Sequence, residues 1–116
     1  MKNENVVLDK SFDFALAIIE LYRQMSENRE YVLSKQVLRS GTSIGANAEE
    51  ANAAISRKDF IAKMAISAKE ARETRYWLRL IERSKIVEVD VSALLDQIAE
   101  LNRLLSSIVK TSQEKS

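Results

Sequence analysis

The chain has 116 residues, no proline and only two glycines, and it carries a formal net charge of +1 at pH 7. A chain of this length fits one domain, residues 1–116, and buries roughly 65% of its unfolded surface, enough for a core of its own. The small net charge excludes a uniformly basic nucleic-acid-binding protein, so any basic surface must be local. Because turn-forming residues are so few, the composition predicts an all-α protein.

The chain also contains neither histidine nor cysteine. This absence removes the usual ligands of zinc and di-iron sites, the commonest general base and the commonest activated nucleophile. We therefore expect no enzyme activity, no cofactor, no metal and no small-molecule substrate. A lack of cysteine fits a reducing compartment, and the apolar run at residues 6–8 is too short for a signal peptide or a membrane span. The expected location is cytoplasmic, with no membrane partner.

The first predicted helix covers about residues 9–28, and Asp9 or Ser11 is expected to be its N-cap. Its main apolar stripe consists of Phe12, Leu16, Ile19 and Tyr22. A second set widens the buried surface and consists of Phe14, Ile18, Leu21 and Met25. The polar segment 26–30 predicts a short connection to the next helix.

The second predicted helix, about residues 31–55, contains both glycines. Residues at spacings of four and three form a packing seam, namely Val37, Gly41, Ile44, Ala48, Ala51 and Ile55. Its small members predict close approach of a partner helix, whereas a phosphate loop would need a lysine and a helix N-terminus that this segment lacks. One flank is a polar stripe of Gln36, Ser40, Ser43, Asn47 and Glu50. The other flank is a candidate subunit contact and carries Leu38, Gly45 and Asn52.

The third predicted helix covers residues 57–84, with Ser56 as N-cap and Asp59 answering it three residues later. Its seam is Phe60, Met64, Ser67, Ala71, Thr74, Leu78 and Ile81. A second face is an apolar and acidic subunit-contact candidate made of Ile66, Glu70, Glu73, Trp77 and Leu80. Because tryptophan is enriched at interface centres, we favour a subunit contact for Trp77 over the edge of the core. A third face is a basic stripe of Lys69, Arg72, Arg75, Arg79 and Arg83.

The fourth predicted helix covers about residues 91–110 and follows a connection at residues 86–90, with Asp90 or Ser92 as its cap. Its seam is Leu94, Ile98, Leu101, Leu105 and Ile108, and residues 110–116 form a polar tail expected to fray. Four helices of similar length with short links favour antiparallel neighbours. The sequence therefore predicts an antiparallel up-down-up-down four-helix bundle.

Two blocks of sequence carry a family resemblance. Residues 38–47, read as LRSGTSIGAN and followed by Glu49-Glu50-Ala51, and residues 69–80, read as KEARETRYWLRL, resemble the bacterial four-helix-bundle proteins named after intervening sequences in 23S rRNA genes. The resemblance implies a homopentamer. It also implies kinship with the accessory variability determinants of diversity-generating retroelements, which bind nucleic acid and a reverse transcriptase and are strongly basic, whereas this chain is nearly neutral.

Two interpretations of the polar surface follow. The carboxylates of Glu49, Glu50, Glu70 and Glu73 are expected to form salt bridges with Arg39, Arg72 or Arg75 rather than to hold a metal. Arginine rows on a helix can follow phosphates, so the basic stripe is a candidate RNA or DNA contact, although acids such as Asp59 and Glu82 would neutralise it in the alternative. We favour a non-enzymatic, self-assembling binding or scaffold module with nucleic acid or a ribonucleoprotein as partner. The alternative is a protein-directed adaptor or homo-oligomeric structural protein with no nucleic-acid role.

Overall fold

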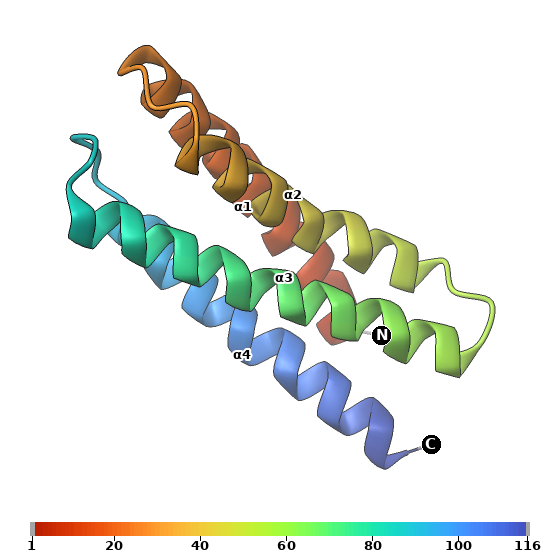
Figure 1. The fold of residues 1–116 in the computed structure, drawn as a ribbon. Coiled ribbons are helices and arrows are strands. Elements are labelled where there is room, and N and C mark those ends of the chain that lie inside the picture. Colours follow the sequence, from red (N-terminus) through yellow and green to blue (C-terminus); the bar gives the residue numbers. More distant parts are fainter. Residues whose placement is uncertain (1, 116) are drawn as a thin grey trace.

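The computed structural model describes residues 2–115, and every element in that range is a helix. The helices are α1 (Lys2–Glu27), α2 (Leu33–Asn52), α3 (Arg57–Ser84) and α4 (Ser92–Glu114). They run up and down in turn, and α1 packs against α2, α2 against α3, α3 against α4, and α4 against α1 (Figure 1). The prediction of an all-α four-helix bundle is confirmed. Within residues 2–115, α1 and α3 make no contact with each other, so they occupy opposite corners of a bundle with extents of 46 × 20 × 20 Å.

The bounds of α3 agree with the prediction because its start is specified by local chemistry. The Ser56 side chain accepts a hydrogen bond of 3.0 Å from the backbone N–H of Asp59, which confirms the predicted cap. The helix ends at Ser84, and the next residue, Lys85, adopts the left-handed conformation with φ of 53°. The other starts differ from the prediction. The first helix begins at Lys2 rather than near residue 9, and Ser11, a proposed cap, is buried inside it and donates to the carbonyl of Leu8.

Acidic side chains outside the helices start α2 and α4. The carboxylate of Glu30 accepts hydrogen bonds from the backbone N–H groups of Val32, Leu33 and Ser34, at 3.2, 3.0 and 2.7 Å. Asp90 accepts from the backbone N–H of Ser92 at 2.9 Å and from its hydroxyl at 2.7 Å, and these bonds lower the pKa of Asp90. The residue at the cap position of α4 is Val91, so neither predicted residue occupies it. The tail predicted to fray continues the helix to Glu114.

The core draws on one stripe from each helix. The seams predicted for α3 and α4 are buried except for Phe60, which is half-buried, and the seam of α2 is buried except for Ile55. The prediction for Ile55 is wrong: α2 ends at Asn52, Ile55 lies in the connection to α3, and it is 97% exposed. Because Ile55 lies beyond the end of the helix, the spacing of three and four residues that predicted it in the seam does not apply to it.

The face of α1 that enters the core also differs from the prediction. The set described as widening the stripe is the core face, and it includes Phe14, Ile18, Leu21 and Met25, with Val7. The stripe predicted as the main seam points outward, where Phe12 is 60% exposed and Leu16 54% exposed, and Ile19 is also exposed. Both sets repeat with helical spacing, so periodicity could not tell which of them the other helices cover.

Candidate functional site

The glycine-containing segment of α2 packs on both of its sides, against α1 on one side and α3 on the other. A Cβ atom added at Gly41 would lie 2.9 Å from Cγ1 and Cγ2 of Ile18, and one added at Gly45 would lie 3.3 Å from Oγ of Ser11. Both glycines therefore let α1 approach α2 closely. The prediction that Gly41 serves helix packing is confirmed. Gly45, a candidate subunit contact, is instead buried against its own chain.

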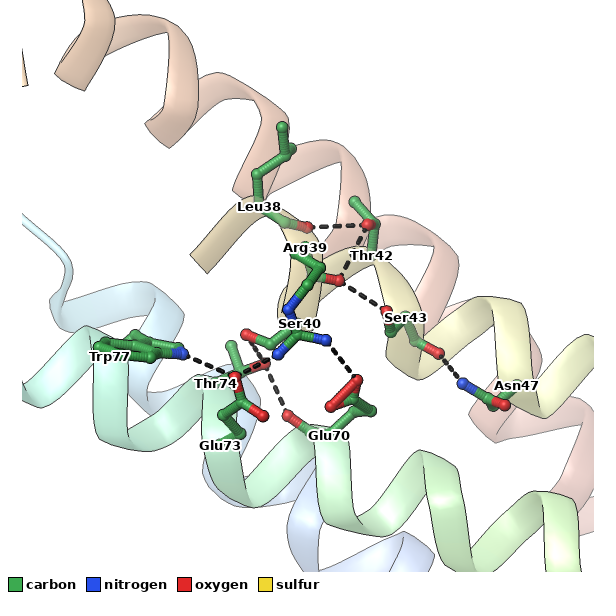
Figure 2. Close-up of polar contacts among 10 residues, drawn as sticks. All are labelled: Leu38, Arg39, Ser40, Thr42, Ser43, Asn47, Glu70, Glu73, Thr74 and Trp77. Carbon is green, nitrogen blue, oxygen red and sulfur yellow. Dashed lines mark hydrogen bonds and ion pairs between the residues drawn. The ribbon is translucent and has the colours of Figure 1, made fainter. Parts of the chain in front are cut away.

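The opposite side of α2 is joined to α3 by a buried polar seam. The hydroxyl of Ser67 donates to the carbonyl of Ile44 at 2.7 Å. Figure 2 shows the second bond of the seam, in which Oγ1 of Thr74 lies 2.9 Å from Oγ of Ser40. The Ser40, Ser67 and Thr74 side chains are fully buried, so these bonds satisfy polar groups that would otherwise be costly in the core. The seam also fixes the register of the two helices, because each hydroxyl has one partner position on the neighbouring helix.

An ion-pair cluster lies at the edge of this seam and ties four side chains together. Arg39 of α2 donates to Glu70 at 2.9 Å and also to Glu73, and the indole Nε1 of Trp77 donates to Glu73 at 3.0 Å (Figure 2). Glu70 is buried, with 7% of its surface exposed, while Arg39 reaches solvent. The expected salt bridge between these glutamates and Arg39 is confirmed.

The electrostatics of the cluster follow from these bonds. The hydrogen bond from Trp77, followed by the bond from Arg39, holds the pKa of Glu73 below its usual value. The bonds to Glu73 and Glu70 in turn raise the pKa of Arg39. Arg39 and Glu73 are therefore charged at neutral pH, and the carboxylates of the cluster are already occupied by donors from the same chain. Such carboxylates are poorly suited to act as a general base.

Three further polar side chains of α2, those of Thr42, Ser43 and Asn47, form hydrogen bonds within the helix. Thr42 donates to the carbonyl of Leu38 at 2.7 Å, Ser43 donates to that of Arg39 at 2.7 Å, and the amide of Asn47 donates to that of Ser43 at 2.9 Å. These bonds run to the preceding turn, so they add no surface for a ligand. Within the predicted polar stripe, Ser40 is thus bonded across the buried seam to Thr74, and Ser43 and Asn47 are bonded to backbone carbonyls of their own helix.

The subunit-contact candidates do not lie together as one free surface. On α3, Glu70 and Glu73 are bonded to Arg39 and Trp77 is bonded to Glu73, whereas Ile66 is 42% exposed and Leu80 is half-buried. On α2, Leu38 is half-buried against the core, and Asn52 is exposed. Among the described side chains, three exposed apolar residues instead share the outer face of α1, namely Phe12, Leu16 and Ile19. We call these three residues the α1 outer stripe.

The basic stripe of α3 is open to solvent along its whole length. Its members, all exposed, are Lys69, Arg72, Arg75, Arg79 and Arg83. Among the side chains described, residues 5–115, none of the five takes part in an ion pair. The acids suspected of neutralising the stripe do not do so, because Asp59 pairs with Lys63 and Glu82 makes no ion pair within the same range.

Two neighbours extend the basic stripe. Arg72 borders a shallow hollow of about 270 Å³ between α3 and α4, where Lys110 of α4 adds a further cation. Tyr76, which sequence reasoning missed, lies on the same side of α3, four residues after Arg72 and three before Arg79, and is 55% exposed. The signal for Tyr76 was present in the sequence, because an aromatic residue at those spacings shares the face of the arginines.

A hollow at the connection between α3 and α4 has a volume of about 670 Å³. Its lining includes the acidic residues Glu82, Glu88 and Asp90, together with Lys85. Among the residues that the structure describes, no three acidic side chains gather closely enough to hold a metal ion.

The architecture defines the class of this protein as an all-α four-helix bundle whose α2–α3 seam is closed by hydroxyl bonds and an ion-pair cluster. A model of the family described as 23S rRNA-intervening sequence protein matches residues 3–107, and the chain therefore belongs to that family. It is similar to a protein of unknown function from the S23 ribosomal protein family of Bacteroides thetaiotaomicron, with 49% sequence identity and a TM-score of 0.87. The match covers 93% of this chain and 98% of that chain. A comparison with curated proteins found no match.

The blocks that carried the family resemblance meet in space. The α2 block supplies Gly41, Gly45, Ser40 and Arg39, and the α3 block supplies the Glu70, Glu73, Thr74 and Trp77 partners of the seam and cluster (Figure 2). Most of the residues named in these two blocks therefore serve to pack α2 against α1 and α3. In the part of the chain that the structure describes, no helix combines the length and apolarity needed to cross a membrane.

Proposed function

We propose that this protein is a non-enzymatic, self-assembling bundle that binds nucleic acid through the basic stripe of α3. The observation that carries the proposal is the stripe itself: five exposed cations on one helix, without an ion pair among the described side chains. Leaving like charges together on one face is unfavourable unless an anionic partner neutralises them. Phosphate groups of RNA or DNA provide that partner, and a local stripe of this kind is compatible with a net charge of only +1.

The assembly part of the proposal rests on the α1 outer stripe. Phe12, Leu16 and Ile19 are exposed on the side of α1 that faces away from the core, so no element of the described chain covers them. An exposed apolar stripe of this kind marks a protein contact, and the family resemblance implies five subunits. Because α1 and α3 occupy opposite corners of the bundle, a contact through the α1 outer stripe leaves the basic stripe of the same subunit open.

Substitution of Leu16 by glutamate tests the assembly. The variant is expected to have a lower mass by multi-angle light scattering, approaching the 13.2 kDa of one chain, with unchanged helicity by circular dichroism. The carboxylate introduced at position 16 would have to lose its hydration when the subunits come into contact, which is strongly unfavourable. Gln24→Glu is the matched control, because it introduces the same charge at another exposed position of α1. If Trp77→Ala lowers the mass and Leu16→Glu does not, the subunit contact lies on the face of α3 that includes Trp77, and the role proposed for α1 is refuted.

Substitution of Arg75 and Arg79 by glutamate tests the nucleic-acid contact. We expect wild-type protein to bind RNA or DNA with an affinity that falls as salt rises, and the double variant to lose at least about tenfold in affinity at low salt. The control is Arg29→Glu with Lys35→Glu, which makes the same change in net charge at exposed positions outside α3. Fluorescence anisotropy with labelled oligonucleotides measures both.

Wild-type protein that assembles but binds neither RNA nor DNA at low salt would refute the nucleic-acid role. The alternative function, a protein-directed adaptor or a homo-oligomeric structural protein, would then account for the chain. If the stripe variant and the control lose the same amount of affinity, the protein attracts nucleic acid through its net charge alone. That result would also contradict a binding site at the basic stripe. Purification from native cells, with and without nuclease, connects both parts of the proposal because it reports assembly mass and bound nucleic acid together. A cytoplasmic location is part of the same proposal.

A further inference from the structure

The centre of the basic stripe holds an exposed aromatic ring. Tyr76 is 55% exposed, and helical geometry places it about 6 Å along the axis from Arg72 and about 4.5 Å from Arg79. Residues three and four positions apart are neighbours on a helix surface, so the ring is flanked by a guanidinium group on each side. The stripe therefore contains a flat apolar surface as well as positive charge.

The ring of Tyr76 is supported by its neighbour Trp77. It packs edge-on against Trp77, with ring centroids 5.2 Å apart and an interplanar angle of 67°. Trp77 is itself fixed, because its indole donates to Glu73, which is bonded in turn to Arg39 of α2. This chain of contacts limits the rotamers of Tyr76, and a ring that is already ordered loses little entropy when a ligand stacks on it.

The two chemistries of the stripe select different features of a nucleic acid. Arginines bind phosphates in any strand, whether paired or unpaired. An aromatic face binds the face of a base, and base faces are accessible in single strands but are covered by neighbouring base pairs within a duplex. Resting on the nucleic-acid function proposed above, we propose that the stripe binds single-stranded nucleic acid, with a base stacked on Tyr76 and its flanking phosphates on Arg72 and Arg79.

The experiment compares a labelled uridine oligonucleotide with an RNA duplex of the same length, by fluorescence anisotropy at two salt concentrations. Wild type is expected to bind the single strand more tightly than the duplex. Tyr76→Ala is expected to weaken single-strand binding by about tenfold and to leave duplex binding within about twofold. Because no charge is lost, the dependence of affinity on salt stays as in wild type, whereas Arg75→Glu with Arg79→Glu reduces it. Tyr76→Phe keeps the ring and is expected to retain single-strand binding.

Other outcomes refute the inference and separate it from the proposed function. If Tyr76→Ala binds both ligands as wild type does, or weakens both equally, the stacking role is wrong and the stripe acts by charge alone. If wild type binds neither ligand at low salt, the proposed function fails and the inference fails with it. If Tyr76→Ala lowers the assembly mass in light scattering, the ring belongs to a subunit contact, and the base-stacking role is again wrong.

Discussion

Replacement of Gly41 by leucine is expected to lower the free energy of unfolding by about 3 kcal/mol. Even the first carbon of the new side chain would lie 2.9 Å from both Cγ atoms of Ile18. Those atoms are attached directly to a branched Cβ, so Ile18 cannot move them away without leaving its rotamer. The variant must therefore separate α1 from α2 or repack the core. Urea unfolding followed by circular dichroism measures the loss, at one fixed protein concentration because assembly would add to stability.

Gly45→Ala is the control for this prediction. The added Cβ would meet Oγ of Ser11 at 3.3 Å, a contact that a shift of a few tenths of an ångström relieves. Alanine also gains about 1 kcal/mol of helix propensity over glycine, which offsets the tighter contact, so stability should stay within about 1 kcal/mol of wild type. Wild-type stability of the Gly41→Leu variant would contradict the close-packing explanation of the α2 segment.

Replacement of Arg39 by methionine is the second change with a large expected effect. It keeps an apolar stem of similar length but leaves the buried carboxylate of Glu70 without its cation. Removing one partner of a buried pair costs about 3–5 kcal/mol, and because Arg39 is itself half-exposed we expect a loss of about 2–3 kcal/mol in urea unfolding.

Two further variants show whether the loss comes from the unpaired charge. Arg39→Met combined with Glu70→Met removes both charges and should be more stable than Arg39→Met alone. Arg23→Met breaks the pair with Glu20, in which both side chains are largely exposed, and should cost less than about 1 kcal/mol. A double variant no more stable than the single one would show that the cost lies in lost packing rather than in the isolated carboxylate.

Elements with local signals were predicted from the sequence, and α3 is the best example. Ser56 and Asp59 specify its start through one hydrogen bond, and a single unambiguous seam follows. For α1 the local signals were misleading. Ser11 resembles a cap but lies in the core beside Gly45, and the apolar residues form two faces of similar quality. Only the positions of the other helices decide which face is buried.

The parts of the candidate site that depend on one helix could be predicted from the sequence, and the parts that depend on contacts between helices could be predicted only in part. The basic stripe follows from spacing on one helix, so all five of its members could be named from the sequence, and their exposure agrees with the free face expected of them. The pairing of Arg39 with both Glu70 and Glu73 joins residues more than thirty positions apart in the chain, and sequence reasoning could offer it only among several pairs. The hydrogen bond from Trp77 to Glu73 belongs to the same cluster, whose geometry depends on how α2 packs against α3. The subunit contact favoured for Trp77 stays a prediction.

The opposite placement of α1 and α3 has a consequence for how tightly a long strand would be held. In an assembly joined through the α1 outer stripe, every subunit contributes its own copy of the α3 stripe to a separate part of the surface. A strand bound to one copy is kept near the next, so the second contact forms at a high effective concentration and the combined affinity can exceed that of one site by about 10²–10⁴-fold. Strand length, rather than base sequence, would then be the property that such an assembly discriminates.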